Sequence, residues 1–289
     1  MRLSTSTNIL DYVPDRQDPI PVEECLRRCS QAGYKVMDMN FCDQSGKGRP
    51  LTKPNWQDWV NQVGEAAQKY DITFSQSHTL FYNVCDYTVK EREENEELVR
   101  RAIIGSGMLG VKWIVIHAGT VNESGYSFRE SMKRNHEYFL PHIELAKKYN
   151  CGIAIENLPE NDRKNREFAA AVEELLELVD SFDDSSVGIC WDFGHAHLTN
   201  ESQEKSLRRI GQRLKATHVA DNHRNFDEHL APFYGTIDWY PLMKVLTEIK
   251  YAGDFTFEIH SFMRKFPDAL RDQLLVHTYD LGQYLISKA

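Results

Sequence analysis

Strand-like and helix-like segments alternate eight times along the 289 residues, and this alternation limits the folds that are open to the chain. The apolar, strand-like segments recur roughly every 30 to 40 residues, about the length of one β-strand with its crossover helix. They are Leu3–Asn8, Lys35–Phe41, Ile72–His78, Trp113–His117, Gly152–Glu156, Val187–Asp192, Ala216–Ala220 and Phe255–His260. Eight such units predict a closed (β/α)8 barrel rather than an open doubly wound sheet.

Amphipathic helical patterns fill the intervals between these segments. They are Val22–Ala32, Trp56–Lys69, Glu91–Met108, Phe128–Tyr149, Glu167–Val179, Ser202–Gly211, Trp239–Ile249 and Pro267–Ile286. No Pro/Ser-rich linker divides the chain, so residues 1–289 are expected to form a single α/β barrel domain. No Gly-rich fingerprint follows the first strand, so a nucleotide cofactor is not expected.

Composition narrows the class of partner. The formal net charge of −9 argues against a nucleic acid or an anionic membrane surface as the partner. The sequence contains no apolar run long enough for a membrane span and no signal-peptide core after Met1. The six cysteines show no pairing framework, and no nearby ligand completes a metal site at Cys25 and Cys29. We therefore expect free thiols and a reducing, cytoplasmic compartment.

Four consecutive strand-like segments end on side chains that ligate hard metal ions. These residues are Glu156, Asp192, His218 and Glu258. The carboxyl ends of parallel barrel strands meet at one mouth, where active sites lie. Buried carboxylates repel one another unless a cation or a proton neutralises them. The oxygen-rich set predicts a site for a divalent metal: Mn²⁺, Mg²⁺ or Co²⁺, with Zn²⁺ also compatible.

Glu156 and Glu258 form a potential acid–base pair. Their strands are three positions apart around a barrel of eight, so the two carboxylates are expected to face each other across the pocket. Such a pair can remove a proton from one face of a sugar and return it to the other. A metal on the adjacent oxygens would stabilise the enediolate as its charge develops.

A second group of potential ligands surrounds the first four residues. It consists of His78, His117, His195, Asp227 and His229. Histidines at strand ends often only bind substrate or form structural hydrogen bonds. Alternatively, these five residues hold one or two further ions, and their imidazoles favour Zn²⁺. Both interpretations, substrate or structural contacts and further metal sites, are compatible with the sequence.

Two long loops and one basic segment carry further alternatives. The loops Asn40–Pro54 and Asp221–Ile237 lie on the predicted catalytic face, where they can act as lids or ligand walls. Gly46–Arg49 is either a surface tip or a contact for an anionic substrate group. The basic cluster Lys205–Lys215 suits phosphate contacts of a nuclease, but its position on an outer helix favours a solvated face.

Several phrases around these residues make the chain resemble the xylose-isomerase-like TIM-barrel superfamily. They are Ile155–Pro159, Cys190–His197, His218–Asn222, Asp227–His229 and Gly235–Trp239. The superfamily contains sugar and sugar-phosphate isomerases and epimerases, and a branch of metal-dependent AP endonucleases. The resemblance covers essentially the whole chain.

The resemblance to ketose epimerases implies a role for individual residues. It implies that Glu156 and Glu258 ligate the metal and exchange the proton. It implies that Asp192 and His218 are metal ligands, and that His195 and Arg224 bind substrate oxygens. A supporting Glu commonly stands six residues after the position of Glu156, and this chain has Asp162 there.

The AP-endonuclease branch supports an alternative hypothesis, a trinuclear-zinc phosphodiesterase. Its trinuclear zinc ligands match all nine residues of the two groups above. The phrases Glu156–Pro159 and Trp191–His197 nevertheless read as those of the sugar enzymes. The sequence therefore predicts a divalent-metal-dependent sugar isomerase or epimerase with a small carbohydrate as substrate. The alternatives are a lyase or dehydratase on a keto-sugar or glycoside, a trinuclear-zinc phosphodiesterase, and a non-enzymatic binding module.

Oligomeric state is left open by the sequence. Barrels of this kind often pair, and Trp56, Trp59 and Trp239 are candidate interface residues. Tryptophans at helical spacing are more often part of a core.

Overall fold

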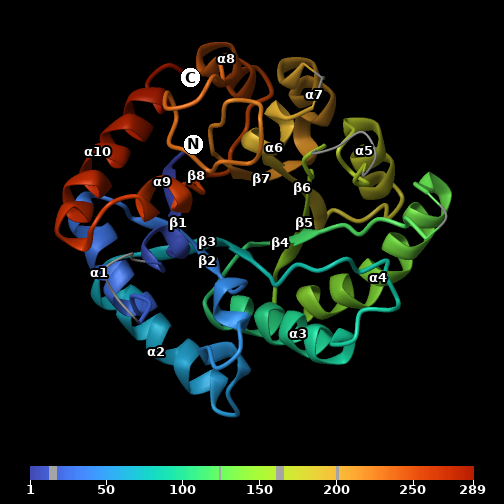
Figure 1. The fold of residues 1–289 in the computed structure, drawn as a ribbon, viewed down its shortest axis with the longest axis horizontal. Coiled ribbons are helices and arrows are strands. Elements are labelled where there is room, and N and C mark those ends of the chain that lie inside the picture. The colour runs from blue at the N-terminus through green and yellow to red at the C-terminus, as the bar shows by residue number, and fades with distance from the viewer. Residues whose placement is uncertain (13–17, 124, 161–165, 200–201) are drawn as a thin grey trace.

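The computed structural model describes residues 1–12, 18–123, 125–160, 166–199 and 202–289, and eight parallel strands form its centre (Figure 1). The strands are β1 (Leu3–Ser6), β2 (Val36–Asn40), β3 (Thr73–His78), β4 (Trp113–His117), β5 (Gly152–Glu156), β6 (Val187–Asp192), β7 (Leu214–His218) and β8 (Phe255–Phe257). From β1 to β7 each strand pairs with the next one in the chain, and β1 also pairs with β8.

The barrel closes between β7 and β8. A parallel bridge joins Val219 to Phe257, just beyond the end of β7. The Val219 amide donates to the Thr256 carbonyl at 2.8 Å, and the Glu258 amide donates to the Val219 carbonyl at 3.1 Å. Closure confirms the (β/α)8 barrel that the eightfold alternation predicts.

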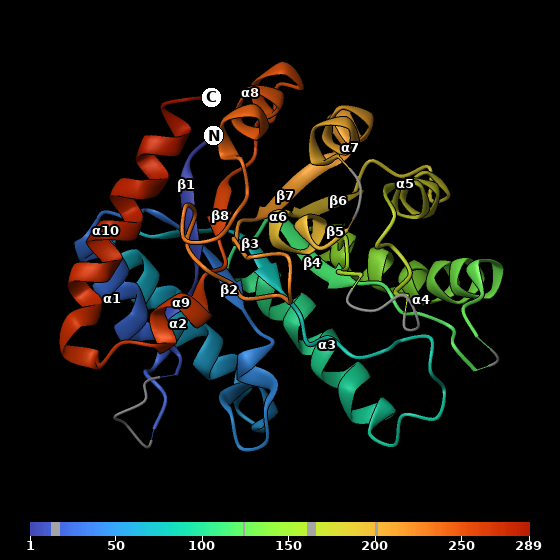
Figure 2. The same ribbon diagram turned by 45° about the horizontal axis from the view of Figure 1, so that its top comes forward.

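Helices surround the strands and bury their outward-facing side chains (Figures 1 and 2). They are α1 (Val22–Ala32), α2 (Trp56–Lys69), α3 (Arg92–Met108), α4 (Phe128–Lys148), α5 (Val172–Asp180), α7 (Gln203–Ile210), α8 (Trp239–Glu248) and α10 (Asp268–Ile286). Two short helices, α6 (Phe193–His197) and α9 (His260–Arg264), follow the ends of β6 and β8. Short 3₁₀ turns cover Thr7–Leu10, Asp43–Ser45, Pro50–Thr52 and Gly211–Arg213.

Alternation along the strands separates the barrel interior from the helix-packed core. Side chains two residues apart on a strand share one face. The residues two positions before the strand-end ligands therefore point inward, and they form a buried cluster of their own. They are Val115, Ala154, Cys190 and Ala216. Their small size leaves room for long polar side chains one layer above them.

Four segments differ by two or more residues from their predicted ends, among them the strand expected over Ala216–Ala220, which spans Leu214–His218. The helix expected from Glu167 begins at Val172, because residues 168–170 are buried and Ala169 has a positive φ of 68°. The first strand stops at Ser6, whose hydroxyl caps the following 3₁₀ turn. The last strand stops at Phe257. The hydrophobic periodicity of the sequence does not predict these ends, because they depend on tertiary packing and on local caps.

Cysteines and tryptophans in the described residues take structural positions. All six cysteines are free, and Cys25 and Cys29 are buried with their Sγ atoms 3.9 Å apart. Trp56 and Trp239 are buried within the chain, which removes these two as candidates for an interface. Within the same described part, the helices are all too short or too polar to cross a membrane.

Asp221 holds the loop between β7 and α8, which carries two of the predicted ligands. Its Oδ1 accepts hydrogen bonds from the backbone amides of Asn222 and Ile237 at 2.9 and 3.0 Å. Its Oδ2 accepts from the Phe233 amide at 3.1 Å and from the Trp239 indole at 3.0 Å. One buried carboxylate therefore fixes four points of the loop.

We predict that Asp221→Asn lowers the free energy of unfolding by about 2–5 kcal/mol, because the amide nitrogen cannot accept two of these bonds. Urea denaturation measures the change. Asp238→Asn is the matched control, since Asp238 is exposed at the start of α8 and makes no side-chain cap bond. Its effect should stay within about 0.5 kcal/mol. Equal stability of the two variants would contradict the role of Asp221.

Candidate metal centre

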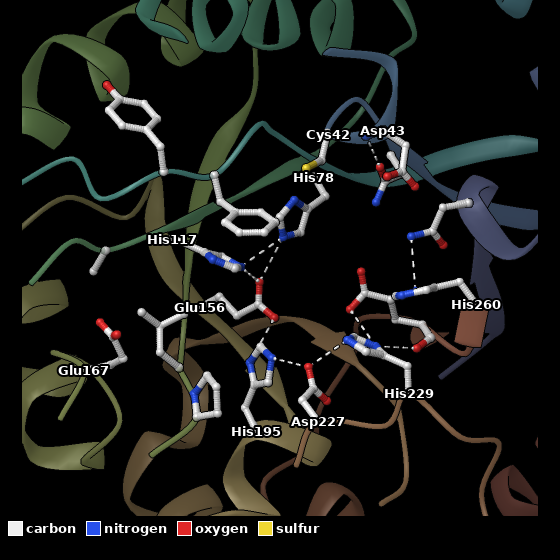
Figure 3. A pocket seen from close by; sticks show the side chains of 18 of the residues that line it. Cys42, Asp43, His78, His117, Glu156, Glu167, His195, Asp227, His229 and His260 are labelled. Carbon is white, nitrogen blue, oxygen red and sulfur yellow. Dashed lines mark hydrogen bonds and ion pairs between the residues drawn. The ribbon is translucent and has the colours of Figure 1, made fainter. Parts of the chain in front are cut away.

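A cavity of about 530 Å³ lies at the carboxyl ends of the strands (Figure 3). Seven of the nine predicted ligands line it: His78, His117, Glu156, His195, Asp227, His229 and Glu258. Asp192 and His218 are buried, at 0% and 1% exposure, and lie within ligand distance of Glu156 and Glu258. Residues from six elements and one long loop therefore meet at one place, as the strand-end pattern predicts.

Glu156 lies at the centre of the cluster, at the end of β5. Its Oε1 is 2.8 Å from Nδ1 of His218. Its Oε2 is 2.9 Å from Nε2 of His117 and 3.2 Å from Nε2 of His78. Figure 3 shows the carboxylate between the His78–His117 pair and His195. A single carboxylate thus connects three imidazoles from three different strands.

Three of the histidines are oriented by their own backbone surroundings. His78, His195 and His229 each place Nδ1 within 2.7–2.9 Å of a backbone carbonyl. Donation of the Nδ1 proton to a carbonyl leaves Nε2 free to act as an acceptor or a ligand. This is the usual support for a metal-binding histidine.

His218 is supported by a carboxylate that the sequence reading missed. Its Nε2 lies 3.3 Å from Oδ2 of Asp38, which is fully buried on β2. Gln76 donates to the same oxygen at 2.8 Å and accepts from the Thr256 hydroxyl at 3.1 Å. The signal available in the sequence was an acidic residue within the buried strand Val36–Asn40. This network directs Nδ1 of His218 toward Glu156.

Asp227 joins two histidines on the other side of the cluster. Its Oδ2 lies 2.7 Å from Nε2 of His229 and 3.3 Å from Nε2 of His195. His195 is placed by the start of α6, where its amide donates to Oδ1 of Asp192 at 2.7 Å. The loop after β7 and the short helix after β6 therefore converge through side chains that are already anchored.

The pKa values of the buried carboxylates and imidazoles in the cluster are shifted by burial and by one another. Burial opposes ionisation of Glu156, but His218 and His117 hold its pKa well below the usual range. Burial raises the pKa of Asp192 to about 6, although His195 partly offsets it. Burial disfavours the imidazolium of His229, yet Asp227 raises its pKa to about 9. Protons on the imidazoles thus balance the carboxylates, and a bound cation would displace those protons.

The side chains fit divalent metal ions. Ligand atoms lie within 4.8 Å of one another in three sets: His78, His117 and Glu156; Glu156, Asp192, His218 and Glu258; and His195, Asp227 and His229. Among the described residues, Oδ2 of Asp192 and Oδ1 of Asp227 are buried without a hydrogen-bond partner. Oxygens of this kind suit a cation. Cys190 is also close, but burial raises the pKa of its thiol and disfavours the thiolate that a metal requires.

One residue that the resemblance implies for substrate binding, Arg224, is not part of this arrangement. Arg224 does not line the cavity in the described structure; its guanidinium donates to the Thr199 carbonyl at 3.0 Å. Arg224 lies in the long loop after β7, as expected, but its side chain points toward Thr199 rather than into the cavity. Asp162 lies outside the described residues.

The cavity also contains residues that the sequence reading did not single out. They include Asn8, Asp43, Glu167, His260 and Arg264. Glu167 accepts a hydrogen bond from the Thr120 hydroxyl at 2.6 Å. These side chains come from loops and short turns, whose conformation periodicity does not predict. Gly46–Arg49, in contrast, lies outside the cavity, and Arg49 pairs with Asp11.

We predict that Asp38→Asn weakens divalent-metal binding by about 10–100-fold, because His218 loses the carboxylate that orients it. Titration calorimetry with Mn²⁺ and with Zn²⁺ measures the affinity. Asp254→Asn is the control: Asp254 is a buried carboxylate at the opposite end of the barrel, paired with Arg2. Equal losses in the two variants would indicate general damage to the barrel and contradict a specific role for Asp38.

Known proteins resemble this chain in sequence and in fold. An uncharacterized protein of Methanocaldococcus jannaschii, MJ1311, is 28% identical over 225 residues, 76% of this chain and 74% of its own length. A crystal structure of D-psicose 3-epimerase with D-fructose has a TM-score of 0.75 at 13% identity and covers 99% of both chains. The IolI protein with a bound zinc atom has a TM-score of 0.77 at 18% identity and covers 100% of this chain and 99% of that one.

A family model provides the assignment that these pairwise similarities do not. The model described as the xylose isomerase-like TIM barrel matches residues 26–275. That range includes every strand from β2 to β8 and all nine ligand candidates. The closed barrel and the strand-end cluster agree with the match. The chain therefore belongs to the xylose isomerase-like TIM barrel family.

Proposed function

We propose that this protein is a divalent-metal-dependent isomerase or epimerase of a sugar or a sugar derivative. One observation carries the proposal: carboxylates from β5 and β8, three strands apart, converge with Asp192 and His218 at the floor of the cavity. Two carboxylates beside a shared cation site suit the transfer of a carbon-bound proton. The resemblance in fold to D-psicose 3-epimerase supports the same class of reaction.

In the proposed reaction, Glu156 and Glu258 exchange a proton with a carbon next to the substrate carbonyl. One carboxylate removes it and the other returns a proton to the opposite face. A divalent ion on Glu156, Asp192, His218 and Glu258 would offset the negative charge that develops on the neighbouring oxygens. His218 and His117 keep Glu156 ionised, which is the form a base requires. His195 is proposed to orient the substrate oxygens.

Solvent isotope exchange tests the proposal. The metal-loaded protein in D₂O should introduce deuterium at one carbon of a ketose, and NMR measures this incorporation. Glu258→Gln and Glu156→Gln should each reduce the exchange rate by about 10²–10⁴-fold, since the amide cannot accept the proton. Metal content measured on each variant separates loss of the base from loss of the ion. No exchange by the wild type over a broad panel of aldoses, ketoses and keto-sugars would refute the proposal; loss of a leaving group would indicate a lyase.

Phosphodiester hydrolysis is a second candidate, because the three ligand sets could hold three ions, and two of these sets share Glu156. The surroundings favour it less. Asp43 and Glu167 add negative charge to the cavity, which opposes a phosphate backbone. In the basic cluster Lys205–Lys215, all three arginines pair with acidic side chains, among them Arg208 with Glu248.

We predict no nicking of a duplex with an abasic site by the zinc-loaded protein under conditions that give isotope exchange on sugars. Gel electrophoresis of a labelled duplex provides the measurement. Efficient nicking by a protein with about three zinc ions per chain would overturn the sugar assignment in favour of the nuclease.

A further inference from the structure

The cavity has a second polar region, formed at the ends of β1, β2 and β8. Asn8 lies in the turn after β1, Asp43 in the turn after β2, and Arg264 in α9 after β8. In Figure 3, Asp43 and His260 lie on the opposite side of the cavity from Glu167. None of the three side chains belongs to a metal-ligand set within the described residues. This region is therefore distinct from the ligand sets but adjoins them in the same cavity, since the His260 ring lies 4.2 Å from the ring of His229.

Each of these side chains keeps one buried polar atom without a partner. Among the described residues, Oδ1 of Asn8, Oδ2 of Asp43 and Nε of Arg264 are buried without a hydrogen bond. Asn8 is only 5% exposed. An unpaired buried polar atom destabilises a protein, so three of them in one cavity call for an explanation. A bound ligand with hydroxyl groups would supply a donor to Asn8 and Asp43 and an acceptor to Arg264.

The remaining contacts hold this region in place. Nδ2 of Asn8 lies 3.4 Å from Nδ1 of His260. The Asp43 amide donates to Oδ1 of Asn40 at 2.9 Å, and Arg49 donates to the Asp43 carbonyl at 3.0 Å. Both ends of the Asp43 peptide are therefore fixed before any ligand arrives. Such preorganisation lowers the entropy lost on binding.

Asp43 and Arg264 bring opposite charges to this region, which restricts the ligand. One carboxylate and one guanidinium line the same cavity. Burial raises the pKa of Asp43 overall, and Arg264 partly offsets this. A phosphate or carboxylate would gain from Arg264 but would be repelled by Asp43. Neutral hydroxyls meet no such conflict.

We propose that Asn8, Asp43 and Arg264 form the subsite for the end of the substrate remote from the metal, and that they select an unphosphorylated, polyhydroxylated chain. The inference rests on the proposed function and specifies its substrate class. Hydroxyls at the remote end donate to Asn8 and Asp43 and accept from Arg264, so a longer neutral chain binds better than one too short to reach them. Specificity of this kind arises because a missing partner leaves buried polar groups unpaired.

Chain length and charge provide the test. Initial rates of the metal-loaded wild type should favour a six-carbon ketose over a four-carbon ketose, and over the same six-carbon ketose phosphorylated at its far end. Asp43→Asn should lower the ratio of kcat/KM for the neutral to the phosphorylated substrate by about tenfold, because Arg264 is then unopposed. Arg264→Gln should reduce the preference for six carbons, acting mainly through KM.

Calorimetry with four- and six-carbon alditols keeps the test independent of turnover, since alditols have no carbonyl to react. Tighter binding of the six-carbon alditol, lost in Asp43→Asn, would support the subsite even if no isotope exchange occurred. Asp58→Asn removes a charge at an exposed position of α2 and should change neither ratio. The proposal is wrong if the Asp43 and Arg264 variants keep wild-type length and charge preferences while retaining metal content and melting temperature.

Discussion

The active end of this barrel depends on the balance of charge around one buried carboxylate. Glu156 is 1% exposed and contacts imidazoles from β3, β4 and β7. A buried carboxylate is strongly disfavoured unless positive charge compensates it. Protonated histidines can provide that charge, and so can a divalent ion. The arrangement therefore stabilises the fold around Glu156, and in the proposed function it also provides the ligands of a metal.

The barrel brings these side chains together because alternate residues of each strand point to its interior. The ligands and the residues two positions before them share the inner face, and small side chains such as Ala154 and Ala216 fill the layer below. Several of these candidate ligands are then oriented by a further contact: Asp38 supports His218, and backbone carbonyls support His78 and His195. Because rigid elements hold these supports, the geometry of the cluster does not require a ligand to form it.

The sequence predicted the fold well, because its pattern is local and repeated. Eight apolar runs at regular spacing leave few alternatives to a closed barrel, and charged residues at their ends mark the mouth. The convergence of the nine candidate ligands followed from the same rule. Asp38 could not be assigned, because its role depends on a histidine 180 residues away. Arg224 was expected at the substrate, but its loop turns the guanidinium toward Thr199.

The second polar region, formed by Asn8, Asp43 and Arg264, could not be predicted from the sequence either. Asn8 and Asp43 lie in short turns just after strands, and Arg264 lies in a one-turn helix that replaces part of an expected strand. Their proximity arises from barrel closure rather than from any local pattern. In the proposed function, they divide the cavity into a reacting end with the candidate metal ligands and a second polar end. That division would favour a neutral sugar over a phosphate backbone.

A crystal structure of the metal-loaded protein with a neutral ketose, with anomalous data to identify the ions, tests the central claim most directly. We predict an ion held by Glu156, Asp192, His218 and Glu258, with the reacting carbon of the ketose between the carboxylates of Glu156 and Glu258. An ion bound without Glu156 and Glu258, or a ketose with both carboxylates on the same face of that carbon, would contradict the account.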